Sequence, residues 1–129
     1  MKTDVVTLFA ALADPTRLRL LNLLNRGEVC VCFFVEVLRE TQTKISRHLA
    51  YLRRAGIVAA RRDGKWMHYR IVRPDDEKLA AVLDTTLQAI SDERQMVRDR
   101  MVLERACCGI KLPPSLEHAP RPTLVAEGP

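Results

Sequence analysis

The residues best suited to chemistry in this 129-residue chain are four cysteines, arranged as two close pairs. Cys30 and Cys32 stand one residue apart, and Cys107 and Cys108 are adjacent near the end of the chain. Thiolate sulfur is a soft ligand that suits zinc, cadmium, lead and copper(I), and trivalent arsenic and antimony favour sets of three thiolates. No apolar run approaches the ~20 residues that cross a bilayer, and the start lacks a secretory pattern. A cytoplasmic chain with reduced thiols is expected, so metal or redox chemistry is favoured over a disulfide framework.

A strongly basic segment follows the first cysteine pair. Between Arg39 and Arg73 there are ten Lys or Arg residues and two acids, a local balance of +8, whereas the whole chain carries a net charge of +5. The remainder of the chain is therefore acidic. A basic block within an otherwise acidic chain is typical of a protein that binds a polyanion such as DNA.

The hydrophobic spacing within this segment predicts a helix-turn-helix. A short helix is expected over residues 32–39, followed by a polar turn and a second helix that Thr43 caps. In the second helix Ile45, Leu49 and Leu52 recur at helical spacing and form the inner face. Two short helices joined by a tight polar turn, the second of them basic on its outer face, indicate a DNA-binding helix-turn-helix.

A β-hairpin is expected directly after the helix-turn-helix. Residues 58–62 and 65–71 flank Asp63-Gly64, which is a strong signal for a two-residue turn. In this position a hairpin is a wing. Its tip is basic, which suits contact with phosphates.

Helices on both sides of this unit would complete a winged-helix dimer. Apolar residues at helical spacing predict helices over residues 4–13 and 16–26, and one long helix over 74–105. A helix of roughly thirty residues extends ~45 Å, which is longer than so small a domain needs for its own core. The predicted fold is mainly α with a small β-hairpin, a winged helix-turn-helix homodimer that associates through its first and last helices. Residues 1–110 would form this DNA-binding and dimerisation domain, and 111–129 a flexible Pro-rich tail.

The outward residues of the second helix and of the wing tip are the predicted DNA contacts. Helix side chains can hydrogen-bond to base edges and phosphates in the major groove, and wing cations can hold phosphates without reading sequence. The predicted DNA-binding residues are Gln42, Thr43, Lys44, Ser46, Arg47 and His48 on the helix and Arg61, Arg62 and Lys65 on the wing. For His48 a solvated surface position is the alternative. A two-fold dimer implies double-stranded operator DNA with inverted half-sites.

Four short motifs mark the predicted elements. They are Asp14-Pro15-Thr16-Arg17-Leu18, Cys30-Val31-Cys32, Ile45-Ser46-Arg47-His48-Leu49 and Asp63-Gly64-Lys65. Together they resemble the ArsR/SmtB family of bacterial metal-responsive repressors, and its arsenic-responsive branch in particular, over about residues 5–105. The resemblance implies a transcriptional repressor, not an enzyme, that leaves its operator when As(III), Sb(III) or methylated As(III) binds cysteine thiolates.

The resemblance does not extend to the whole thiol site. In the arsenic-responsive branch the Cys-Val-Cys motif is followed two residues later by a third cysteine, and this chain has Val35 there. The adjacent pair near the end of the chain is the evident replacement. The predicted metal ligands are therefore Cys30, Cys32, Cys107 and Cys108, within one subunit or across two. The alternative is that the second pair consists of tail thiols without a ligand role.

The spacing of Cys30 and Cys32 also predicts how ligand binding would act. On a regular helix the two side chains would lie ~200° apart, so both could reach one ion only if the start of that helix unwinds. The expected result is distortion of the support beneath the DNA-reading helix. Such a coupling typically lowers affinity by roughly 5–150-fold.

Other functions are open from the sequence. A thiol redox sensor could use either cysteine pair. A zinc-type site needs histidines on the last helix, and residues 79–105 contain none; a cadmium or lead type adds cysteines from an N-terminal arm, and 1–29 contain none. A thiol-based arsenate reductase would need a Gly-rich loop to cradle phosphate, and the five glycines form no such loop. His68 and His118 are expected to be plain surface residues.

Overall fold

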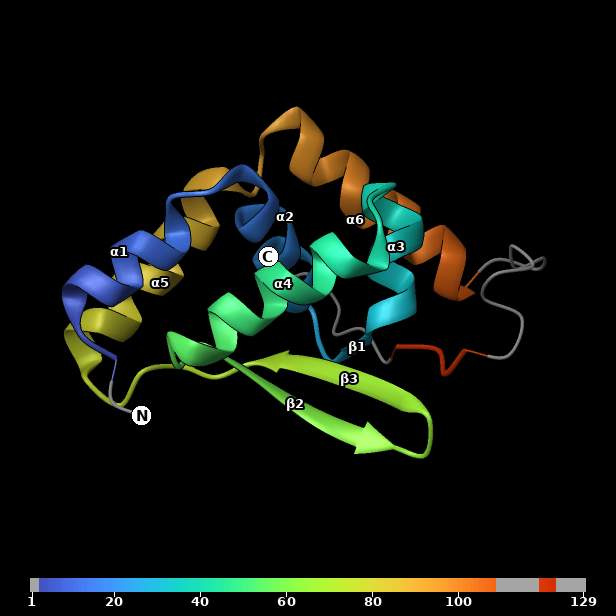
Figure 1. Cartoon of the computed structure of the whole chain (residues 1–129). Helices are drawn as coiled ribbons and strands as arrows, with labels where there is room; N and C mark the ends of the chain where they lie inside the picture. The colour runs from blue at the N-terminus through green and yellow to red at the C-terminus, as the bar shows by residue number, and fades with distance from the viewer. Residues whose placement is uncertain (1–2, 109–118, 123–129) are drawn as a thin grey trace.

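Six helices and a three-stranded sheet make up the part of the chain that a computed structural model describes, residues 3–108 and 119–122. In chain order the elements are α1 (Val5–Leu12), α2 (Pro15–Leu24), β1 (Val29–Cys30), α3 (Val31–Leu38), α4 (Gln42–Arg54), β2 (Val58–Asp63), β3 (Trp66–Ile71), α5 (Glu77–Ile90) and α6 (Arg94–Cys108). The sheet lies along the lower edge of the molecule in Figure 1, with the helices above it. This arrangement confirms the predicted winged helix-turn-helix.

The helix-turn-helix consists of α3, a turn and α4. Arg39 follows α3 in the left-handed conformation (φ 59°), which is uncommon for a residue other than glycine and sharpens the turn. Thr41 then caps α4, since its hydroxyl oxygen accepts a hydrogen bond from the Lys44 amide at 3.2 Å. The prediction of Thr43 as the cap is therefore wrong, because α4 begins at Gln42 and Thr43 lies within its first turn. The two threonines differ only in position, which residue type does not reveal.

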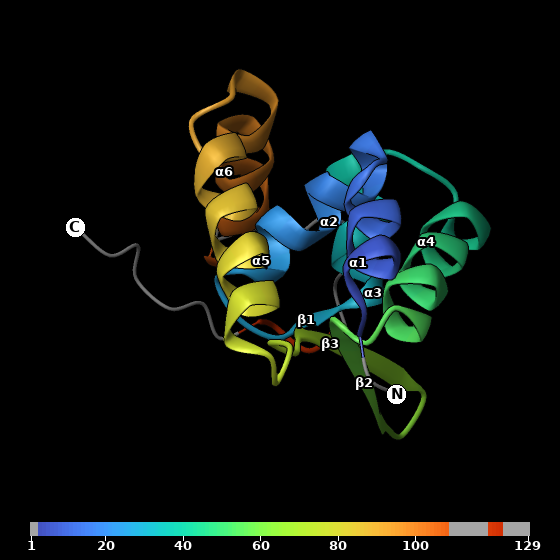
Figure 2. The same ribbon diagram turned by 90° about the vertical axis from the view of Figure 1, so that its left-hand side faces the viewer.

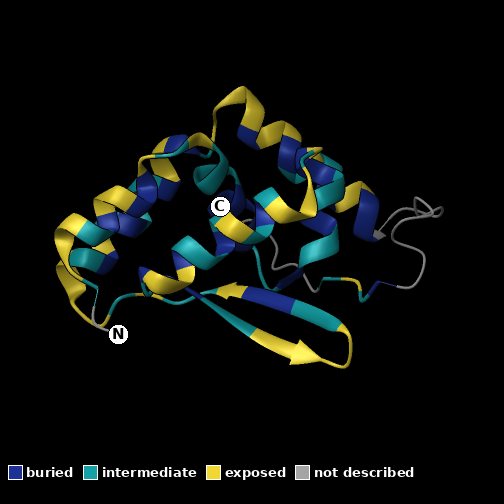
Figure 3. Cartoon of the chain, in the orientation of Figure 1, coloured by how far each residue is buried: buried dark blue, intermediate teal, exposed yellow. Residues whose placement is uncertain are grey.

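The inner face of α4 anchors this motif to the core. Ile45, Leu49 and Leu52 are fully buried, as the sequence predicts. They belong to one cluster with the leucines of α2 and the two phenylalanines of α3. Figure 3 shows buried and exposed positions alternating along α4. Burying such a side chain contributes roughly 1.5–3 kcal/mol, so this face fixes the orientation of the helix.

The wing is a hairpin of β2 and β3, as predicted, with Gly64 at φ 60° in its turn. A third strand, β1, was not predicted from the sequence. β1 pairs antiparallel with β3, with Val29 opposite Tyr69 and Cys30 opposite His68, which gives the strand order β1-β3-β2. Two residues are too few to show the alternation by which a strand is recognised.

The single long helix predicted over residues 74–105 is wrong. The chain forms two helices there, α5 and α6, with a break that begins at Ser91. The Ser91 hydroxyl donates to the Gln88 carbonyl oxygen at 2.8 Å, a local bond that competes with helix continuation. The helical phase restarts after the break, and Val97 and Met101, which continue the hydrophobic spacing of α5, are exposed on α6.

Helix α6 folds back over α2 and α3 instead of extending away from the domain (Figures 1 and 2). Asp99 of α6 is almost completely buried and accepts two hydrogen bonds from Arg19 of α2, at 2.7 and 2.9 Å. Asn22 of α2 donates to the Met96 carbonyl oxygen at 3.1 Å and accepts from Arg100 at 2.7 Å. These contacts hold α6 against the DNA-binding unit.

Two further predictions concern the ends of the chain and the membrane. None of the described helices is both long enough and apolar enough to cross a bilayer. Within the predicted tail, 111–129, residues 119–122 are described, and Ala119 is buried against the core cluster. The other tail residues lie outside the described part of the chain, and the flexibility of the tail stays a prediction.

Candidate thiol site and DNA interface

Cys30 and Cys32 lie together at the junction between β1 and α3. Cys30 is the last residue of β1 and precedes α3 with an extended backbone (φ −73°, ψ 143°), whereas Cys32 lies in the first turn of the helix. Their sulfur atoms are 3.1 Å apart. Cys30 is fully buried and Cys32 is half-buried. The expectation that the helix start must unwind is therefore wrong: Cys30 stands outside the helix, so helical rotation does not separate the two thiols.

The proximity of the two sulfurs changes their acidity in opposite directions. The Cys32 thiol donates a hydrogen bond to Cys30 and lowers the pKa of Cys30 to about 7, with help from nearby backbone amides and against the effect of burial. The pKa of Cys32 rises well above its usual range, because Cys32 is the donor in that bond and is itself partly buried. Around pH 7 a large fraction of the protein therefore carries a Cys30 thiolate that accepts a hydrogen bond from the Cys32 thiol. A thiolate is the form that binds a soft ion.

Deprotonation of the pair should follow from this geometry. We expect the thiolate absorbance of the wild-type protein to rise through a step near pH 7, because the pKa of Cys30 is lowered to about 7. In the Cys32→Ala variant the hydrogen-bond donor is lost, so the step should move toward the ordinary cysteine value of ~8.5 or higher. A step that stays in place in this variant would mean that Cys32 does not stabilise the thiolate. The measurement is ultraviolet absorbance against pH.

The second cysteine pair does not join the first among the described residues. Cys107 is buried on α6, and its thiol contacts the Glu104 carbonyl oxygen at 3.5 Å. In residues 3–108 and 119–122 no group of three or more Cys, His, Asp or Glu side chains lies close enough to hold a metal ion. The side chain of Cys108 is outside the described part. Helix α6 nevertheless packs against α3, the helix whose first turn contains Cys32. The four-cysteine set stays a prediction.

The prediction of His68 as a plain surface residue is wrong. His68 is buried on β3 directly opposite Cys30. Its Nδ1 lies 4.0 Å from a Glu28 carboxylate oxygen, and its Nε2 lies 3.8 Å from Asp63 with no hydrogen-bond partner among the described residues. The pairing of β3 with β1 causes this burial, and β1 is the strand that the sequence did not reveal.

The predicted DNA-binding residues of α4 differ in their exposure to solvent. Gln42, Thr43 and Arg47 are exposed, and Ser46 is partly exposed. Lys44 is partly exposed and donates to the Glu40 carboxylate at 3.1 Å. Exposed side chains on the outer face of the second helix are the groups that can reach base edges.

His48 faces inward, toward the start of α2. Its Nδ1 lies 3.4 Å from an Arg17 nitrogen and 3.9 Å from the Asp14 carboxylate. Burial lowers the pKa of His48, although Asp14 acts in the opposite direction. Arg17 also stacks on the Tyr51 ring, 4.1 Å from its centroid, and donates to the carbonyl oxygen of Ala11 at the end of α1. A DNA contact by His48 stays a prediction, and its position supports a role in bracing α4.

The three basic wing residues are all exposed, but they have different partners. Arg61 pairs with Glu28 at 2.6 Å. The Lys65 ammonium lies 5.1 Å from the centroid of the Trp66 ring. Arg62 forms no ion pair within residues 3–108 and 119–122. Arg62 and Lys65 are therefore the wing cations best placed to meet phosphates.

Neutralising Arg62 or Lys65 should weaken DNA binding without changing which sequence is preferred. For Arg62→Gln or Lys65→Gln we expect affinity to fall for all sequences alike, and the slope of log K against log salt to decrease by about one. The reason is that a phosphate contact acts through counterion release and carries no base information. Salt-dependent binding to two unrelated duplexes measures this. A changed sequence preference would contradict the wing assignment.

Comparison with known proteins agrees with this geometry. Residues 14–60 match the family described as "Bacterial regulatory protein, arsR family". The chain is 38% identical over 105 residues to the arsenical resistance operon repressor of Escherichia coli strain K12, covering 81% of this chain and 89% of that protein. It is 44% identical over 91 residues to the arsenic resistance transcriptional regulator ArsR1 of Pseudomonas putida strain KT2440, covering 66% and 70%.

A solved structure gives the same relationship. The AntR antimony-specific transcriptional repressor matches with a TM-score of 0.56 and 37% sequence identity, covering 70% of this chain and 80% of that one. These relatives are transcriptional regulators, two of arsenic resistance and one specific for antimony. The basic residues of α4 and the wing and the thiol pair at the start of α3 are consistent with such relatives. The chain belongs to the arsR family of bacterial regulatory proteins.

Proposed function

We propose that this protein is a metalloid-responsive transcriptional repressor, which binds operator DNA as a homodimer and leaves it when As(III) binds cysteine thiolates. The observation that carries the proposal is the pair of sulfur atoms 3.1 Å apart at the start of the helix-turn-helix. One thiol of this pair is ionised near neutral pH, because the pKa of Cys30 is about 7. Arsenite would form one As–S bond with each thiol and release water.

The effector set is proposed from the chemistry of the thiols. Cys30 and Cys32 supply two ligands, and Cys107 or Cys108 is the proposed source of a third, because α6 packs against α3. Antimonite has the same preference for sulfur, and the relative AntR is described as antimony-specific. Methylated As(III) needs fewer protein thiols and would suit the first pair alone.

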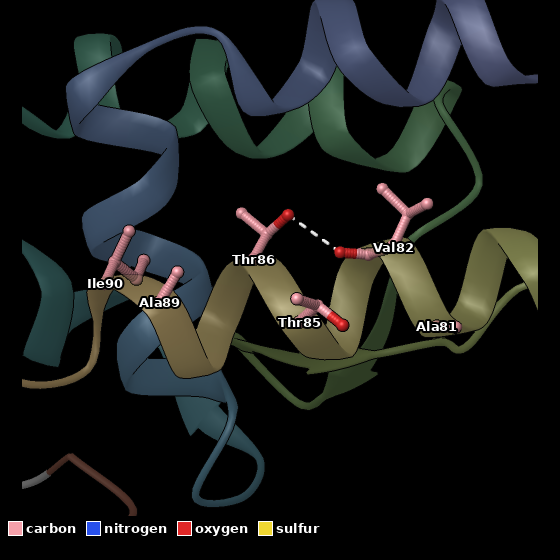
Figure 4. A pocket seen from close by; sticks show the side chains of 6 residues that line it. All are labelled: Ala81, Val82, Thr85, Thr86, Ala89 and Ile90. Atoms are coloured by element: carbon pink, nitrogen blue, oxygen red, sulfur yellow. Dashed lines mark hydrogen bonds between the residues drawn. The ribbon is translucent and has the colours of Figure 1, made fainter.

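The dimer is proposed from an unpartnered surface on α1 and α5. Val5, Val6 and Phe9 of α1 are large hydrophobic residues exposed to solvent. Helix α1 packs beside α5, whose outer side forms a shallow open pocket lined mainly by small residues (Figure 4). Thr86 in this pocket donates to the Val82 carbonyl oxygen at 2.7 Å, which satisfies its hydroxyl within the helix. A second copy of the chain would cover this surface and impose two-fold symmetry on the operator.

The test is release of DNA by metalloid. A duplex selected from a random-sequence pool for tight binding serves as operator, and binding is followed by fluorescence anisotropy with arsenite, antimonite, cadmium and zinc. Release by arsenite or antimonite supports the proposal. Binding that none of these effectors alters would refute it.

A thiol redox sensor is a second candidate, favoured by the same 3.1 Å separation and by the lowered pKa of Cys30. Oxidation of Cys30 and Cys32 would form one S–S bond and pass two electrons and two protons to an oxidant such as a peroxide. Release of DNA by peroxide in the absence of metalloid would favour this candidate over the first.

A further inference from the structure

Glu28 bridges the thiol strand and the wing. It stands just before β1, and its carboxylate accepts hydrogen bonds from Arg61 of β2: from Nη2 at 2.6 Å and from Nε at 2.9 and 3.1 Å. The strand order is β1-β3-β2, so this contact spans β3 and joins the two outer strands. A carboxylate that accepts both Nε and Nη2 of an arginine fixes orientation as well as distance.

The same side of the sheet carries the buried thiol. Cys30 lies opposite His68, and His68 lies opposite Arg61, so the three side chains form a row across the sheet on one face. Glu28 precedes Cys30 by two residues, which places it on that face as well. Its carboxylate oxygen is 4.0 Å from His68 Nδ1. We call Glu28, Cys30, His68 and Arg61 the cross-sheet group.

The charges of the cross-sheet group favour a stable contact in the free protein. Glu28 carries a carboxylate and Arg61 a guanidinium, so the hydrogen bonds between them are also an ion pair. Arg61 is half exposed, and its partner is less so, with side-chain exposures of 54% and 28%. The pair is therefore partly sheltered at Glu28 and open at Arg61. Glu28 directly precedes β1, so a shift of that strand would alter the geometry of the Glu28–Arg61 pair.

We propose that Glu28 is a positioning residue that couples the thiol pair to the wing: it braces Arg61 when the thiols are empty, and a metalloid at Cys30 displaces that brace. The Cys32 sulfur already lies beside that of Cys30, but Cys30 is fully buried, so an ion that binds both sulfurs displaces the strand or its neighbours. The wing then loses the orientation in which Arg62 and Lys65 meet phosphates. This inference rests on the proposed function and names the route by which the thiols act.

The single tryptophan of the chain allows a test that does not depend on DNA. Trp66 begins β3, so its emission reports on the wing. In the wild-type protein, arsenite should produce the ultraviolet absorption of As–S bonds together with a change in Trp66 emission. In Glu28→Gln the absorption should persist and the emission change should shrink. The ratio of operator affinities without and with arsenite should fall by about threefold or more, from the roughly 5–150-fold typical of such coupling.

Three control variants separate coupling from charge. Arg61→Gln should lose coupling to the same degree, and the double variant should lose no more than either single one, because both remove one contact. Arg62→Gln should weaken DNA binding but keep the coupling ratio, and Glu93→Gln removes an exposed acid outside the cross-sheet group and should change neither. As–S absorption with unchanged emission in the wild type, or full coupling in Glu28→Gln, would overturn this inference alone. Absence of the absorption would overturn the proposed function and this inference together.

Discussion

We expect arsenite to release operator DNA from the wild-type protein and to leave the Cys32→Ser variant bound to it. Cys32 supplies one of the two sulfurs at the start of α3, so its replacement by serine removes one of the two thiol ligands. The wild-type ratio of affinities without and with arsenite should lie within the roughly 5–150-fold range of allosteric couplings and fall to about one in the variant. Anisotropy titrations with the selected duplex measure both values.

The control for this result is the affinity of the Cys32→Ser variant for operator DNA in the absence of arsenite. Cys32 does not belong to the exposed face of α4 or to the wing, so the affinity of Cys32→Ser without arsenite should equal that of the wild type. A variant that arsenite still releases would refute a role for the first pair. The Cys107→Ser/Cys108→Ser double variant tests the second pair. Full release from that protein would leave Cys30 and Cys32 as the whole site and refute the four-cysteine set.

The second large effect concerns stability. Asp99→Ala should lower the free energy of unfolding by about 3 kcal/mol, because removal of one partner leaves a buried ion pair broken. The Asp99 side chain is 2% exposed and accepts both hydrogen bonds from Arg19, and it also accepts one from Gln95 at 2.8 Å. The value lies at the lower end of the range for buried pairs because the Arg19 side chain is 21% exposed. Urea unfolding at neutral pH provides the measurement.

A matched pair of controls identifies the contact responsible. Arg98→Ala, a neighbouring exposed position on α6, should change stability by no more than ~0.5 kcal/mol. The Arg19→Ala/Asp99→Ala double variant should be less destabilised than the sum of the single variants, since both remove the same ion pair. Strict additivity, or a loss below ~1 kcal/mol for Asp99→Ala, would contradict the role assigned to this contact in holding α6.

The DNA-binding unit could be predicted from the sequence because its signals are local. Ile45, Leu49 and Leu52 repeat at helical spacing over a full helix, and Asp63-Gly64 has few uses other than a hairpin turn. Helix α3 and the wing therefore appear within a residue or two of their predicted positions. Each of these signals depends on neighbours in the chain and on no distant contact.

The thiol site and the last helices could not be predicted in the same way, because tertiary contacts decide them. The pairing of β1 with β3 takes Cys30 out of the helix and buries His68, and a two-residue strand has no pattern of its own. The break at Ser91 interrupts a segment, residues 74–105, whose hydrophobic spacing predicts one continuous helix. Helix α6 then depends on Arg19, which lies eighty positions before Asp99. Spacing along the chain carries no information on such a contact.

The place of β1 in the sheet has an energetic consequence. It is an outer strand, attached to β3 through two residue pairs, whereas β2 and β3 share six. Opening of a short outer segment requires the loss of few backbone hydrogen bonds, and such local openings can cost far less than global unfolding. The burial of Val29 and Cys30 in the core, more than sheet hydrogen bonding, therefore holds the thiol segment in place. Detection of an effector and durability of the DNA-binding surface are thus assigned to parts of one sheet that are held by different interactions.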